Sequence, residues 1–133
     1  MNKQIFVNLP VKDLKRSMEF FRKLGYTFNP QFTDDKAACM VISDEIFAML
    51  LVENFFQSFT NKDIVDTKKA AELTIALSTE SKAEVDQLLE KAEKAGGIVS
   101  QPTSDLEFMY SRSFQDLDGH IWEILWMDPA HVQ

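Results

Sequence analysis

The 133-residue chain carries one order of predicted elements twice, and this internal repeat limits the possible folds more than any other feature. Apolar residues alternate along residues 5–11, which predicts a strand with one packed face. A helix follows, capped by Asp13 and ended by Gly25. Three short runs typical of strands come next, at residues 26–32, 36–42 and 46–52.

The second half follows the same order. Residues 73–77 alternate as a strand does, and Ser81 with Glu84 forms a capping box that begins a helix ending at Gly96. Three further strands are predicted at residues 98–101, 108–115 and 120–126, the last two joined by the tight turn Asp116-Leu117-Asp118-Gly119. Three pairs of equivalent positions anchor the repeat: Phe6 with Thr74, Gly25 with Gly96, and Met49 with Glu123.

The repeat predicts one domain made of two modules. Module one covers residues 1–53 and module two covers residues 72–127, with a connector at 54–71 and a short tail at 128–133. A chain of this length buries roughly two-thirds of its unfolded surface, which is enough for a core without disulfides.

The charge balance argues against two classes of partner. The chain has 14 Lys and Arg against 21 Asp and Glu, a formal net charge of -7. Nucleic acids and anionic membrane surfaces both require basic patches, so we expect neither as a partner. Its one cysteine, Cys39, can form no internal disulfide, and no apolar run is long enough to span a bilayer. These features predict a cytoplasmic protein in which Cys39 is a buried, inert thiol.

Two stretches of sequence, together with the repeat, resemble a known family. VNLPVKDLKRSMEFFRKLGY near the start and SFQDLDGHIWEILW near the end are similar to the vicinal oxygen chelate superfamily. This superfamily includes glyoxalase I, extradiol dioxygenases and bleomycin-resistance proteins, and the chain looks most like its lactoylglutathione lyase-related members. The resemblance implies an α+β fold in which two tandem βαβββ modules form a half-open β-barrel with a cleft. Modules in this superfamily pair within one chain or exchange across a dimer, and we expect a homodimer.

The resemblance also implies where a metal ion is held in metal-dependent members. Each module there supplies a ligand, usually His or Glu, from its first strand and another from its last strand. The equivalent positions in this chain are Phe6, Thr74, Glu123 and Met49, or Leu50 instead of Met49 if the register differs by one residue. Only Glu123 is a usual ligand, His120 is expected to point away from Glu123, and His131 lies in the tail. We therefore expect no cofactor, and a divalent metal is disfavoured.

Strand alternation predicts which side chains line the cleft. The uniformly apolar faces are expected to bury against the helices, and they carry Ile5, Val7 and Leu9 in module one and Leu73, Ile75 and Leu77 in module two. The opposite faces carry Phe6, Asn8, Phe47, Met49, Leu51, Thr74, Ala76, Ile121, Glu123 and Leu125. Such a mostly apolar surface with a few polar groups is typical of a small-molecule pocket. The alternative is a filled interior in which Glu123 hydrogen-bonds to Asn8 or Thr74.

Tyr110 and Arg112 are further candidates, because they share one face of the strand before the tight turn. Arg112 either clamps a ligand carboxylate or phosphate, pairs with Glu123, or lies on the surface. The predicted ligand-binding set is therefore Phe6, Asn8, Phe47, Met49, Thr74, Tyr110, Arg112 and Glu123.

Three functions fit these residues. The first is metal-independent binding of an apolar or aromatic small molecule, as in bleomycin-resistance proteins. The second is catalysis by a lactoylglutathione lyase-like lyase, an isomerase, or an extradiol dioxygenase-like oxidoreductase, with Glu123 as general base and with or without a divalent metal. The third is a ligand-free domain that associates through its sheet edges or its Phe-bearing connector.

Overall fold

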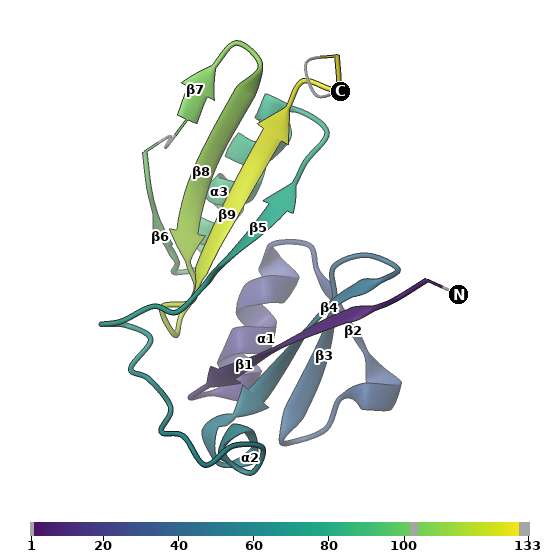
Figure 1. Ribbon diagram of the computed structural model, residues 1–133, viewed down its shortest axis with the longest axis vertical. Coiled ribbons are helices and arrows are strands. Elements are labelled where there is room, and N and C mark those ends of the chain that lie inside the picture. The colour runs from purple at the N-terminus through teal and green to yellow at the C-terminus, as the bar shows by residue number, and fades with distance from the viewer. Residues whose placement is uncertain (1, 102–103, 131–133) are drawn as a thin grey trace. The chain divides into compact units, whose positions relative to one another are not determined.

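The computed structural model describes residues 2–101 and 104–130 and contains two compact units, which divide between Val65 and Asp66 (Figure 1). Each unit is a mixed α+β module with its own sheet, as the sequence predicts. The tail residue His131 lies outside the described residues. None of the helices in the described ranges combines the length and apolar character needed to cross a bilayer.

Module one has the predicted order of strand, helix and three strands. Its elements are β1 (Ile5–Val11), α1 (Leu14–Lys23), β2 (Thr27–Asn29), the 3-10 helix η1 (Pro30–Phe32), β3 (Ala37–Val41), β4 (Ile46–Val52) and α2 (Glu53–Gln57). The sheet order is β1-β4-β3-β2, with β1 parallel to β4 and the other pairs antiparallel. The strand predicted at residues 26–32 is shorter than expected, because Pro30 has no N–H for the ladder and begins η1.

Helix α1 begins and ends as the sequence predicts. A side-chain oxygen of Asp13 accepts a hydrogen bond from the backbone N–H of Arg16 at 3.1 Å. Gly25 follows the helix with a φ of +104°, a conformation that side chains with a Cβ rarely adopt. The helix buries Phe20 and Phe21 against the apolar face of the sheet.

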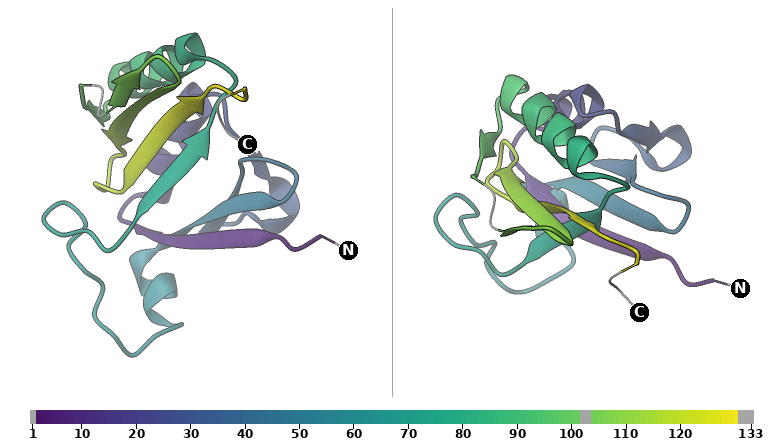
Figure 2. Two further views of the ribbon diagram at one scale, coloured as in Figure 1. Left: turned by 45° about the horizontal axis from the view of Figure 1, so that its top comes forward. Right: turned by 90° about the horizontal axis from the view of Figure 1, so that it is seen from above.

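Module two repeats this order with one additional strand. Its elements are β5 (Thr74–Ser78), α3 (Lys82–Lys94), β6 (Ile98–Val99), β7 (Ser104–Leu106), β8 (Met109–Gln115) and β9 (Ile121–Met127). The sheet order is β5-β9-β8-β6, with β7 paired to β8, and α3 covers one face of this sheet (Figure 2). The described residues therefore form nine strands rather than eight, in two sheets that do not close.

Strand register confirms the repeat residue by residue. In module one, Asn8 of β1 pairs with Met49 of β4 across a parallel ladder. In module two, Ala76 of β5 pairs with Glu123 of β9 in the same way. The predicted equivalences of Phe6 with Thr74 and Met49 with Glu123 fit both ladders. The two modules thus present matching positions on matching strands.

The turn between β8 and β9 is built around the buried carboxylate of Asp116. One oxygen of Asp116 accepts from the backbone N–H groups of Asp118 and His120, each at 3.0 Å, and the other accepts from the indole N–H of Trp122 at 3.0 Å. Burial raises the pKa of Asp116, while the adjacent His120 and the indole N–H of Trp122 oppose that rise. The Thr67 hydroxyl donates to the Asp118 carbonyl, which ties the connector to this turn.

Two residues predicted to be buried against helices are exposed. Ile5 is 57% exposed and Leu73 is 47% exposed. Ile5 is the first residue of β1, and Leu73 precedes β5, so neither lies in the middle of its strand. The residues further along the apolar face of module one, such as Leu9 and Val11, are buried as expected.

Candidate functional site

The open face of module one, the face away from α1, carries two stacked aromatic rings. Phe6 and Phe47 are paired residues of β1 and β4, and their ring centroids lie 4.8 Å apart with 12° between the ring planes. We call this pair the aromatic platform. Phe6 is 49% exposed, although the burial of an aromatic side chain away from water is favourable. The platform is therefore an apolar surface that a flat molecule can cover.

Asn8 and Met49 adjoin the aromatic platform on the same face. Asn8 is exposed, and its side-chain amide has no hydrogen-bond partner among the residues that the structure describes. It thus has free donors and a free acceptor. Met49 is half-buried and adds a flexible apolar contact.

Cys39 lies on the strand next to β4 and is not part of this accessible surface. Its side chain is 1% exposed, and burial raises the pKa of its thiol. A buried thiol of raised pKa is a poor nucleophile, so the prediction of a buried thiol is confirmed and the chemistry of Cys39 is that of a small apolar side chain.

The open face of module two, the face away from α3, carries Glu123 among small residues. Register places Glu123 opposite Ser113 of β8 and Ala76 of β5, with Thr74 diagonal to it. Glu123 is half-buried, and its carboxylate makes no hydrogen bond or ion pair with any described residue. The hydrogen bond from Thr74 that the alternative of a filled interior includes is thus absent from the described contacts.

The residues at the metal positions of the superfamily do not fit a divalent ion. In module one these positions hold the phenyl ring of Phe6 and the thioether of Met49, and in module two a hydroxyl, from Thr74, and the carboxylate of Glu123. Divalent ions in protein sites take several oxygen or nitrogen ligands, which this donor set does not supply. Within residues 2–101 and 104–130, no three His, Cys, Asp or Glu side chains gather into a candidate metal site.

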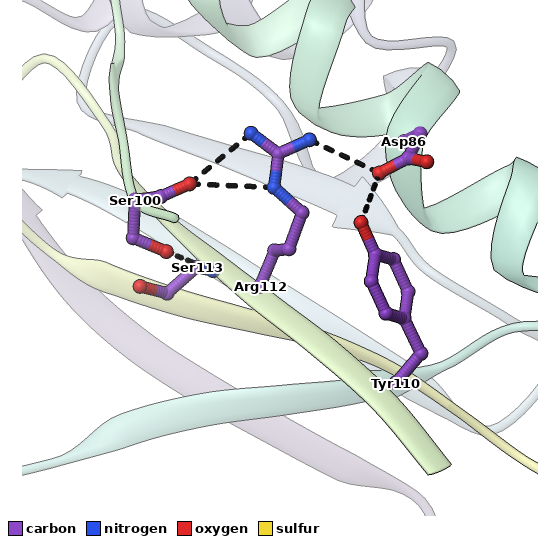
Figure 3. Close-up of polar contacts among 5 residues, drawn as sticks. All are labelled: Asp86, Ser100, Tyr110, Arg112 and Ser113. Atoms are coloured by element: carbon purple, nitrogen blue, oxygen red, sulfur yellow. Dashed lines mark hydrogen bonds and ion pairs between the residues drawn. The ribbon is translucent and has the colours of Figure 1, made fainter. Parts of the chain in front are cut away.

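Tyr110 and Arg112 lie on the opposite face from Glu123, which corrects the expectation that they share a ligand surface with it. The Tyr110 hydroxyl donates to Asp86 of α3 at 2.6 Å, and Nη1 of Arg112 donates to the same oxygen at 3.0 Å (Figure 3). Nε and Nη2 of Arg112 donate to the Ser100 carbonyl at 3.3 and 3.1 Å. The guanidinium therefore links α3 and Ser100, the residue after β6, to β8, and pairs with Asp86 rather than with Glu123.

This cluster predicts a pH-dependent contribution to stability. The Tyr110 hydrogen bond and the Arg112 charge lower the pKa of Asp86. A lowered folded-state pKa contributes stability that is complete above the ordinary aspartate pKa of about 3.9 and is lost as the pH falls through the folded-state value. We expect Asp86→Asn to lower the free energy of unfolding by about 1 kcal/mol at neutral pH, because the site is partly exposed.

Urea unfolding at a series of pH values checks this expectation. The difference between wild type and Asp86→Asn should shrink as the pH falls below about 4. Glu93→Gln, which changes an exposed carboxylate on the same helix without a side-chain partner, is the matched control. A difference that stays constant down to pH 2 would contradict the assigned role of Asp86.

Comparison with known proteins places this geometry in a family. Residues 3–43 match the family model described as bleomycin resistance protein-like N-terminal. The hypothetical protein SA1046 from S. aureus has 33% sequence identity and a TM-score of 0.78, with 95% of each chain covered. The chain therefore belongs to one family with SA1046, and its fold is that of the glyoxalase/bleomycin resistance/dioxygenase, or vicinal oxygen chelate, proteins.

More distant structures share the fold. A glyoxalase/bleomycin resistance protein/dioxygenase family enzyme from Burkholderia phytofirmans is 13% identical, with a TM-score of 0.77 over 95% of this chain and 99% of that one. The fosfomycin resistance protein FosX from Mesorhizobium loti is 16% identical, with a TM-score of 0.71 over 98% and 97% of the two chains. No curated protein matches the chain in sequence.

Proposed function

We propose that the chain binds a small apolar or aromatic molecule and does so without a metal ion. The aromatic platform carries the proposal, because a stacked and half-exposed Phe6 on an open sheet face is a surface that a flat ligand would desolvate. Binding without a metal ion is supported by the residues at the superfamily's metal positions, which do not supply a set of metal ligands.

In this proposal the site lies on the open face of module one. Phe6 and Phe47 stack against the apolar part of the ligand, with Met49 beside them. Asn8 offers an unpaired amide to the ligand's polar end. Tyr110 and Arg112 are left out of the ligand-binding set, because both are engaged with Asp86 on the other face of their sheet.

A fluorescent aromatic probe tests the proposed binding. The neutral dye N-phenylnaphthylamine, titrated in excess chelator, should bind with increased fluorescence. Phe6→Ala should weaken its binding about tenfold, since loss of one aromatic stack and its buried area removes about 1.4 kcal/mol. Phe32→Ala is the matched control, because Phe32 is 62% exposed but lies on η1, outside the platform. Equal effects of the two substitutions, or none from Phe6→Ala, would count against the platform as the site.

Catalysis by Glu123 is the second candidate function, and one observation favours it. The half-buried carboxylate of Glu123 has no partner among the described residues, so it is free to accept a proton from a bound substrate. The relevant assay is lactoylglutathione formation from methylglyoxal and glutathione. Turnover that Glu123→Gln abolishes while dye binding persists would support this candidate. The homodimer and the cytoplasmic location stay predictions.

A further inference from the structure

The exposed side of α1, in module one, carries a row of basic residues, while its other side packs on the sheet (Figure 1). Four exposed side chains form this basic stripe: Lys15, Arg16, Arg22 and Lys23. Residues spaced as i, i+1, i+7 and i+8 lie on one face of an α-helix. We propose that the basic stripe binds a short acidic segment of another protein. The proposal is independent of the ligand site on the sheet.

The basic stripe reverses the charge of the chain that carries it. Its four cations share the face with one carboxylate, Glu19, so the face has a net charge of +3, whereas the whole chain has -7 and the remainder therefore has -10. Glu19 pairs with Lys23 at 3.4 Å, but both side chains are more than half exposed. Such a pair contributes little to stability, so a partner's carboxylates can displace it. The face thus keeps a surplus of positive charge.

The stability of the helix does not explain Lys15 and Arg16. Both lie in the first turn of α1, where the positive end of the helix dipole disfavours cations, and this turn has no acidic residue. The equivalent helix α3 follows the dipole, with Glu84 in its first turn and Lys91 and Lys94 in its last. Residues that break a local stability rule without a compensating contact indicate a function.

The side chains at both ends of the stripe are available to a partner. Those of Lys15 and Arg16 make no hydrogen bond or ion pair with any described residue. The guanidinium of Arg22 lies 5.3 Å from the centroid of the Phe28 ring. This stacking holds the guanidinium in place and leaves the N–H groups at its edge free for a carboxylate. The stripe therefore combines mobile lysines with a positioned arginine.

The size of the stripe and the charge around it favour a short acidic segment over other anionic partners. Helix α1 has 10 residues and is about 15 Å long, the length of about five residues of extended chain. A nucleic acid would run past the stripe and meet the acidic remainder of the chain, and a second copy would bring another charge of -7. A membrane-binding helix inserts its apolar side, but α1 buries Phe20 and Phe21 in its own module.

An NMR titration of the isotope-labelled full chain with unlabelled decaglutamate tests the proposal. At about 50 mM salt, where exposed charges are weakly screened, the peptide should shift the backbone amide signals of α1. We expect a dissociation constant below about 1 mM, which rises with the salt concentration. The same titration with decathymidylate, and co-sedimentation with phosphatidylserine vesicles, should show weaker binding.

The variant Lys15→Gln/Arg16→Gln should weaken decaglutamate binding about tenfold, because it removes two of the four cations. Its thermal midpoint should not fall below that of wild type, since these cations oppose the helix dipole, and this excludes misfolding as the cause. The matched control is Lys91→Gln/Lys94→Gln, which removes the same charge from exposed positions on α3. It should weaken binding less than about threefold, because distant charges are screened.

Several results would overturn the proposal. Decaglutamate that shifts no amide of α1, or that both double variants weaken equally, would mean that the stripe is not the binding surface. Tighter binding of decathymidylate or of the vesicles would identify a nucleic acid or a membrane as the partner. Shifts of the α1 signals that depend on protein concentration alone would identify a second copy of the chain.

Discussion

Asp116→Ala is expected to lower the free energy of unfolding by about 3–5 kcal/mol. Asp116 is 6% exposed, and its two oxygens accept from three N–H groups in the β8–β9 turn. Its removal takes the carboxylate acceptor away from the backbone N–H groups of Asp118 and His120 and from the indole N–H of Trp122. Each unsatisfied buried donor costs about 1–3 kcal/mol, and the missing side chain leaves a void beside Trp122.

Urea unfolding followed by the fluorescence of the tryptophans measures this loss. Asp63→Ala is the control, because Asp63 is exposed and has no side-chain partner among the described residues. It should change the stability by less than about 0.5 kcal/mol. If Asp116→Ala and Asp63→Ala were equally mild, the turn would not depend on the carboxylate, and the hydrogen bonds assigned to it would be wrong.

Gly119→Ala, in the same turn, is expected to lower the free energy of unfolding by about 2–4 kcal/mol. Gly119 has a φ of +87°, and a Cβ at this position would lie 2.5 Å from the Thr67 carbonyl oxygen and 3.0 Å from the Cα of Lys68. These neighbours are backbone atoms, which cannot move aside as the end of a long side chain can. The substitution therefore adds a steric clash to the strain of a left-handed residue.

Gly25→Ala separates the two costs. Gly25 has a φ of +104°, but a Cβ there would meet nothing within 4 Å. Gly25→Ala should therefore lower the free energy of unfolding only by the cost of the left-handed conformation, about 1 kcal/mol. In thermal unfolding, the midpoint temperature of Gly119→Ala should therefore lie clearly below that of Gly25→Ala. Equal losses would mean that residues 67 and 68 do not pack against the β8–β9 turn.

The fold could be predicted from the sequence because its signals are local and occur twice. The cap at Asp13, the capping box at Ser81 and the turn after Asp116 each fix the end of an element, and the structure has all three. Strand β7 was not predicted, since Ser104–Leu106 is too short to show alternation and is stabilised by pairing with β8. Such a strand is specified by its neighbour more than by its own residues.

The site could be predicted only in part. Alternation alone placed Phe6 and Phe47 on one face, and the stacked rings follow from their register. It could not say which face of β8 the helix covers, so Arg112 was grouped with Glu123 instead of Asp86. Asp86 and Asp116 were not predicted to act as acceptors. The donors to Asp86 lie on another strand, so the sequence around Asp86 gives no sign of them. For Asp116, the turn sequence D-x-D-G-H that it begins is the one local indication.

The central proposal is that this protein binds its ligand without a metal. The most direct measurement is the affinity for N-phenylnaphthylamine in excess chelator, compared with the affinity after addition of nickel, zinc, iron or manganese. We predict the same dissociation constant in every condition, because the positions of Phe6, Met49 and Thr74 offer no ligand set for Glu123 to complete. Binding that disappears in chelator, returns with one stoichiometric metal ion and is lost in Glu123→Gln would contradict the account.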